Sequence, residues 1–307
     1  MSRKKPSKPL RAVFVADLHC GSHWGLTDPS ETNKYSPGKQ IQERLYREWQ
    51  DAASGPWAKP DALVVAGDAV EGQSRKDGGT HCWTTDIDEQ VMVAAEMLRK
   101  WKAKQIYILG GSGYHVLVRD SGLSAEEMLA RNVGAVEYPG QDHIPQERRK
   151  RSGIHWFLTF GATTVHVAHH VSISRVFHYK STPIAREMMQ AKLNDPMRRE
   201  LERMYREMPS TKEHRERLDN EVRAFSTKVV IRAHGHYFWA CDAGGTLGMT
   251  LPAWKCPDPF IARRDPLGFG HLGFVGMEFD GDSYRYEKNL VRIEDIERPP
   301  HTLVGGV

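Results

Sequence analysis

The sequence predicts an α/β fold built around a largely parallel inner sheet. Five short apolar runs rich in β-branched residues are typical of buried strands, and they fall at residues 12–19, 62–68, 105–111, 163–170 and 228–236. Helical patterns occupy residues 41–53, 86–103 and 124–133, and the last of these opens with a capping box of Ser124 and Glu127. Strands that alternate with helices in this way form βαβ units, which is why we expect parallel pairing.

The later part of the chain departs from this alternation. Residues 182–225 are charged and have helical patterns, and an apolar strand follows them directly, so we predict a helical insertion inside the domain. Residues 267–291 are rich in aromatic residues and glycine, which favours antiparallel strands joined by a turn at Asp280 and Gly281. We expect these two strands to pair at the edge of a second sheet.

A single domain accounts for most of the chain. A length of 307 residues with 39% hydrophobic content is enough to build one large α/β core. We place this domain at residues 11–295, between a basic N-terminal tail at 1–10 and a C-terminal tail at 296–307.

Composition argues against several classes of protein. No apolar stretch approaches the roughly 18 residues that span a bilayer, and the basic N-terminus lacks the apolar centre of a secretory signal. We therefore expect a cytoplasmic protein without a membrane partner. The four cysteines show no CxxC spacing, which argues against a zinc ribbon or a disulfide framework. The net charge of +4 comes from 43 basic and 39 acidic residues, and this near balance does not by itself predict nucleic-acid binding. The oligomeric state stays open.

Each of the five apolar runs ends in side chains of the metal-ligating type or in glycine beside them. These residues are Asp17 and His19, Gly67 and Asp68, Gly110 to Ser112 with His115 close behind, His169 and His170, and His234 and His236. In an open α/β sheet the carboxyl ends of the strands form the ligand crevice, so residues far apart in sequence meet there. Two aspartates and several histidines in one crevice favour a metal site with room for two ions.

Each motif taken alone has a simpler explanation. The D-x-H of Asp17 and His19 occurs at strand ends by chance, and Gly67 with Asp68 is typical of an ordinary turn. Histidines on a surface would account for the H-x-H at residues 234–236. Together these explanations require five independent coincidences at five strand ends, so we favour the metal site.

The order of these motifs resembles that of the calcineurin-like metallophosphoesterases. The matching motifs are D-x-H, the G-D-x-x-E of Gly67, Asp68 and Glu71, a glycine-led loop with a histidine, a histidine pair and H-x-H, within residues 11–290. Most of the family has Gly-Asn followed by His or Asp where this chain reads "GGSGYH", a departure similar to phage-encoded and prophage members. The resemblance implies an αββα sandwich of four layers, in which helices flank two mixed sheets.

The resemblance also implies a set of metal ligands. They are Asp17, His19 and His236 for a first ion, Asp68 as a bridge, and Ser112, His234 and either His169 or His170 for a second ion. We favour His169 over His170 because it comes first after the apolar run. Ser112 stands where the family has asparagine, and a hydroxyl is a poorer neutral ligand than an amide carbonyl. We therefore expect the second ion to bind weakly or to have its coordination completed by water.

Further residues have expected roles around the metals. By analogy with the loop histidine of the family, His115 would stabilise charge on the phosphate or protonate the leaving oxygen, and a structural hydrogen bond is the alternative. We expect Glu71 to support a metal ligand from behind. Arg119 and Arg175 are candidates for binding phosphate, with solvated surface arginine as the alternative, and His81 is a candidate for lining the pocket.

The sequence therefore predicts a phosphoesterase that hydrolyses a phosphodiester or phosphomonoester with a hydroxide activated by two divalent ions. Manganese is the expected metal, with zinc, iron and nickel as alternatives. One alternative function is a nuclease acting on DNA or RNA, which the basic residues of 146–151 and 198–206 favour. Another is a binding module whose metal site has decayed, which only the missing asparagine supports.

Overall fold

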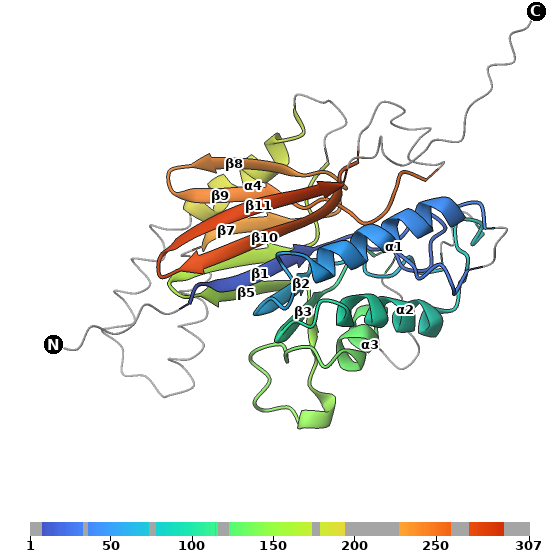
Figure 1. Ribbon diagram of the computed structural model, residues 1–307. Helices are drawn as coiled ribbons and strands as arrows, with labels where there is room; N and C mark the ends of the chain where they lie inside the picture. The colour runs from blue at the N-terminus through green and yellow to red at the C-terminus, as the bar shows by residue number, and fades with distance from the viewer. Residues whose placement is uncertain are drawn as a thin grey trace, which may run out of the picture.

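Two mixed sheets pack face to face and carry helices on their outer sides (Figure 1). This computed structural model describes residues 8–32, 36–73, 78–113, 115, 123–173, 179–193, 227–258 and 270–291. Within them the sandwich of four layers that we expected is confirmed.

The first sheet has six strands in the order β11-β10-β1-β2-β3-β4. Their bounds are β1 Leu10–Val15, β2 Ala62–Val65, β3 Gln105–Leu109, β4 Ser152–Gly153, β10 Leu272–Asp280 and β11 Ser283–Val291. Strands β1 to β4 are parallel to one another, whereas β10 pairs antiparallel with both β1 and β11. The helices α1 (Lys39–Ser54), α2 (Ile87–Arg99) and α3 (Ala125–Asn132) pack on the outer side of this sheet.

The second sheet has five strands in the order β5-β6-β7-β9-β8. Their bounds are β5 His155–Phe160, β6 Thr163–Ala168, β7 Thr227–Arg232, β8 Trp239–Ala243 and β9 Thr246–Thr250. Helix α4 (Thr182–Leu193) lies on its outer side, where it contacts β7, β8 and β9. Of the predicted insertion at 182–225, only α4 falls among the described residues.

The five predicted strands and the three early helices all form. The sequence pattern did not reveal that three of those strands belong to one sheet and two to the other. Ser124 caps α3 as expected, because its Oγ accepts from the Glu127 backbone N–H at 3.2 Å. The described helices include none that is both long enough and apolar enough to cross a bilayer.

The placement of the C-terminal hairpin was predicted wrongly. Strands β10 and β11 extend the first sheet, not the second, and β10 pairs with β1 through Ala12 opposite Met277 and Phe14 opposite Val275. The pattern of residues 267–291 predicts a hairpin but carries no information about which apolar edge receives it. That choice depends on side-chain packing in the finished core.

Alternate residues of β1 serve two different cores. Val13 and Val15 point to the layer of α1, α2 and α3, whereas Ala12 and Phe14 point into the space between the sheets. Because both faces of β1 and β2 are buried, these strands form a rigid platform, and their carboxyl ends are fixed where the predicted ligands begin.

Candidate metal centre

The chain turns sharply after the strands that carry the predicted ligands. Five ligand candidates have left-handed backbone, with φ of 52° at Asp17, 49° at His19, 47° at Asp68, 68° at His234 and 54° at His236. Among the described residues other than glycine, only Lys59 and Lys102 share this conformation. It costs roughly 1–2 kcal/mol per residue, and such strain concentrates at functional sites. At these turns the chain leaves the direction of the strand, and the side chains of the five residues come close together.

A first triad joins the ends of β1 and β7. Atoms of Asp17, His19 and His236 that could bind an ion all lie within 4.8 Å of one another. Oδ1 of Asp17 is 3.4 Å from Nε2 of His236 and 3.9 Å from Nε2 of His19. The other oxygen of Asp17 accepts from the His234 backbone N–H at 3.2 Å, which fixes the carboxylate.

A second triad joins the ends of β2, β6 and β7. It consists of Asp68, His169 and His234, again with their candidate ligand atoms within 4.8 Å of one another. Nε2 of His169 lies 3.1 Å from Oδ2 of Asp68. A third group, His19, Asp68 and His115, meets the same criterion and overlaps the other two.

Several buried atoms in these groups lack a hydrogen-bond partner. They are Oδ1 of Asp17, Nε2 of His19 and Nδ1 of His234, whereas Nε2 of His169 faces only the Asp68 carboxylate at 3.1 Å. Leaving a buried polar atom unpaired costs about 1–3 kcal/mol, so several such atoms at one place are typical of a site that binds a ligand. The atoms are carboxylate oxygen and imidazole nitrogen, which are the donors that manganese, zinc and iron bind. The residues present therefore fit a divalent metal centre.

Glycine makes room for the bridging candidate. A Cβ at Gly111 would lie 1.9 Å from Oδ1 of Asp68, and one at Gly67 would lie 2.5 Å from Nδ1 of His169. Ser112 then fixes Asp68, because its backbone N–H donates to Oδ1 at 2.7 Å and its hydroxyl donates to Oδ2 at 3.0 Å. Ser112 therefore orients this carboxylate, and its predicted role as a ligand stays a prediction.

A buried chain of charged residues stands behind His19. Nδ1 of His19 lies 2.7 Å from Oε2 of Glu71, and the same oxygen is 3.0 Å from Nζ of Lys255. Lys255 is 4% exposed and also pairs with Asp258 at 3.2 Å. Because the carboxylate of Glu71 only accepts, His19 must donate from Nδ1, which leaves Nε2 free to face the first triad.

Burial and neighbouring charges set the protonation states of the cluster. Burial lowers the pKa of His19 to about 4, with Lys255 adding to the effect, and burial also lowers the pKa of His234 to about 4. Both rings are thus unprotonated at neutral pH, as a metal ligand must be. Burial opposes ionisation of Asp68, but contact with His169 outweighs it and lowers the pKa of Asp68.

The remaining predicted residues lie in different surroundings. His170 is exposed, with its ring 4.6 Å from that of His234, and it belongs to none of the three groups. The ring of His81 packs edge-on against Trp24 at 5.3 Å, so its role in substrate binding stays a prediction. Arg119 and Arg175 lie outside the described residues.

Sequence reasoning missed two buried charged residues near the cluster. Lys255 could have been noticed as a single cation in the apolar segment "LPAWKCP". Glu126 is 1% exposed, and neither of its carboxylate oxygens has a hydrogen-bond partner among the described residues. Burial, together with the charge of Asp68, raises the pKa of Glu126 to about 7. By contrast its neighbour Glu127 accepts from Arg131, Arg151 and Ser152.

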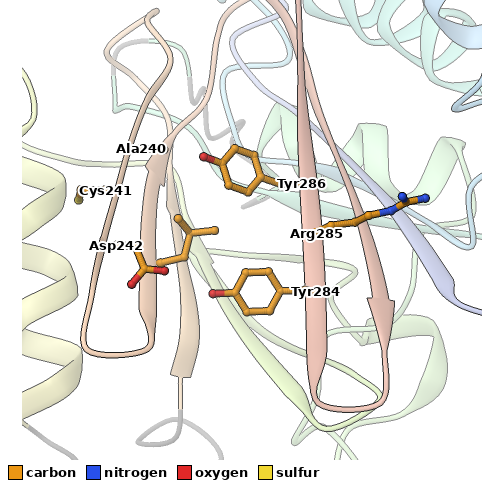
Figure 2. Close-up of a pocket in the computed structure, with 7 residues that line it drawn as sticks. Ala240, Cys241, Asp242, Tyr284, Arg285 and Tyr286 are labelled. Carbon is orange, nitrogen blue, oxygen red and sulfur yellow. The ribbon is translucent and has the colours of Figure 1, made fainter.

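An open cleft of about 450 Å³ lies between β8 and β11, on the two edge strands, and contains none of the predicted site residues. Figure 2 shows Tyr284 and Tyr286 projecting from β11 toward Asp242, while Arg285 points to the other side of the strand. Arg285 pairs there with Glu278. The cleft contributes no group to the metal centre.

No protein-family model matches the sequence, and no curated protein matches it. Solved structures with a similar arrangement include a dimetal phosphatase from Danio rerio, at 12% identity and a TM-score of 0.43 over 92% of this chain and 96% of that one. An archaeal phosphodiesterase has 8% identity and a TM-score of 0.37 over 91% and 100% of the two chains. Vps29 from Entamoeba histolytica, solved with zinc, has 10% identity and a TM-score of 0.37 over 92% and 99%. These TM-scores are all below 0.5, and the metal centre is inferred from the residues of this chain alone.

We predict that the metal-free protein loses stability at high pH through His169. Burial alone would lower the pKa of His169, but Asp68 raises it from 6.5 to about 9. The fold therefore favours the protonated ring, and this stabilisation is complete below pH 6.5 and lost as the pH rises through 9. We expect the free energy of unfolding to fall by about 3 kcal/mol across this range. The measurement is the free energy of urea unfolding of wild-type protein and of His169→Gln, both with chelator present, over this pH range. A difference in free energy between the two proteins that does not vary with pH would contradict the prediction.

We also predict that Lys255→Met destabilises the protein by about 3–5 kcal/mol, because it leaves Glu71 and Asp258 buried without their shared cation. Urea unfolding at pH 7 measures this change. The matched control is Lys104→Met, since Lys104 pairs with Asp61 at 2.6 Å but is 74% exposed, and we expect a loss of less than about 1 kcal/mol. Equal losses of unfolding free energy in the two variants would contradict the prediction that the buried ion pairs of Lys255 matter more than an exposed one.

Proposed function

We propose that this protein is a metal-dependent phosphoesterase that hydrolyses a phosphodiester or phosphomonoester. The observation that carries the proposal is the pair of adjacent ligand triads, which contain buried polar atoms without a hydrogen-bond partner. A pair of divalent ions held there would supply Lewis acidity, lowering the pKa of bound water and neutralising charge on phosphoryl oxygens. The motif order of the calcineurin-like metallophosphoesterases, including their phage-encoded members, is consistent with this chemistry.

Six residues would hold the two ions in this proposal. Asp17, His19 and His236 would hold one ion, His169 and His234 the other, and Asp68 both. Manganese is the metal we expect, because the donors mix carboxylate oxygen with imidazole nitrogen.

Neighbouring groups keep these ligands in place. Glu71 orients the ring of His19, the Ala66 carbonyl orients that of His169 at 2.7 Å, and Ser112 orients Asp68. Preorganised ligands of this kind avoid reorganisation when a phosphate charge develops.

The structure weakens one argument for the nuclease alternative. In the basic segment at 146–151, Arg149 and Arg151 both pair with Glu137, and both also donate to backbone carbonyls. They are thus partly neutralised and engaged within the fold. The second basic segment, at 198–206, lies outside the described residues. Cleavage of an oligonucleotide that falls steeply as salt is raised would favour the nuclease.

Asp68→Asn tests the proposal. We expect wild-type protein loaded with manganese to cleave bis(p-nitrophenyl) phosphate, and the variant to lose about 1,000-fold or more in kcat/KM, because an amide cannot bridge two cations. Release of p-nitrophenol measures the rate.

The matched control is Asp51→Asn, which changes an exposed aspartate on α1 and should leave the rate unchanged. A wild-type protein that binds two manganese ions but hydrolyses no phosphate ester would instead favour the binding module with a decayed activity.

A further inference from the structure

Three histidine rings in the cluster are held in the same way. Nδ1 of His19 contacts Oε2 of Glu71 at 2.7 Å, Nδ1 of His169 contacts the Ala66 carbonyl at 2.7 Å, and Nδ1 of His115 contacts the Glu71 carbonyl at 2.5 Å. Carbonyl and carboxylate oxygens only accept hydrogen bonds, so each Nδ1 carries the hydrogen. A neutral ring then presents the lone pair of Nε2, which is how histidines that bind metal are usually held.

The Nε2 atom of His115 is directed at the cluster. It lies 4.0 Å from Oδ2 of Asp68, and the His115 ring meets the His19 ring edge-on at 4.6 Å between centroids. Candidate ligand atoms of His19, Asp68 and His115 lie within 4.8 Å of one another, as they do in the other two triads.

A tight turn explains how a histidine three residues beyond Ser112 reaches the cluster. The backbone N–H of His115 donates to the Ser112 carbonyl at 3.0 Å, which closes the turn. At the start of the turn, Ser112 is fixed on Asp68. The turn thereby brings the ring of His115 back toward the carboxylate of Asp68.

We propose that His115 is a metal ligand, binding through Nε2 the ion that His19 and Asp68 hold. This inference rests on the proposed function for its metal. It differs from the role of an acid toward the leaving oxygen, because an Nε2 atom that binds an ion through its lone pair carries no proton to give. Glu71 would then be a positioning residue for two ligands, through its side chain to His19 and through its carbonyl to His115.

The test is the manganese affinity of His115→Ala in the full chain. Isothermal titration of chelator-treated protein should show one of two ions bound at least about 100-fold more weakly, because loss of a ligand costs more than the 10–100-fold that follows loss of a residue that only orients a ligand. With cobalt in place of manganese, the visible absorption of the protein should change as an imidazole nitrogen is lost. His143→Ala is the matched control, since His143 is exposed and lies outside the three groups.

Leaving-group dependence separates a ligand from an acid. If His115 is a ligand, the variant should lose the same factor with a phenyl and a p-nitrophenyl phosphodiester, and excess manganese should restore part of the rate. An unchanged manganese affinity, within about twofold, together with a larger loss for the poorer phenyl leaving group, would overturn the inference and restore the acid. Wild-type protein that binds two manganese ions without activity would instead count against the proposed function alone.

Discussion

The burial of two carboxylates side by side is the constraint on which the rest of this structure depends. Asp17 is 0% exposed and Asp68 is 1% exposed, and the backbone hydrogen bond from Asp17 to the Gly67 carbonyl at 3.1 Å holds their segments together. Two like charges removed from water are strongly unfavourable unless opposite charge is nearby. In the protein without metal, contacts with His236 and His169 supply part of it. Divalent ions would supply it far more completely.

The strain at the strand ends is tolerated because the strands themselves are so firmly packed. All four residues of β2 are buried, and β1 is buried from Ala12 to Val15. The aromatic cluster behind them connects to the site directly, since Trp254 packs on Trp49 and donates its backbone N–H to the Asp17 carbonyl at 3.0 Å. A firmly packed core on both faces of these strands can thus hold Asp17, His19 and Asp68 in left-handed conformation.

Glu71 connects the charged interior to the candidate ligands. Its carboxylate accepts hydrogen bonds from Lys255 and His19, and its backbone carbonyl accepts one from His115. Burial works against ionisation of Glu71, but the neighbouring His19 and Lys255 outweigh it and lower its pKa. The carboxylate is therefore kept as an acceptor, and it fixes the orientation of the ring it contacts. A single acidic residue in the G-D-x-x-E motif thus organises two imidazoles and one buried cation.

The sequence by itself determined the strands, the early helices and the residue types at the strand ends. These are local properties, because the period of apolar side chains and the turn residues after them are written in neighbouring positions. The separation of the five runs into two sheets, and the edge that β10 and β11 join, depended on packing between distant residues. The same is true of the choice between His169 and His170: only the fold places the first inside the cluster and the second at the surface. The pairing of Lys255 with Glu71 and the ring orientation of His115 could not be predicted from the sequence, because each depends on a hydrogen bond between distant parts of the chain.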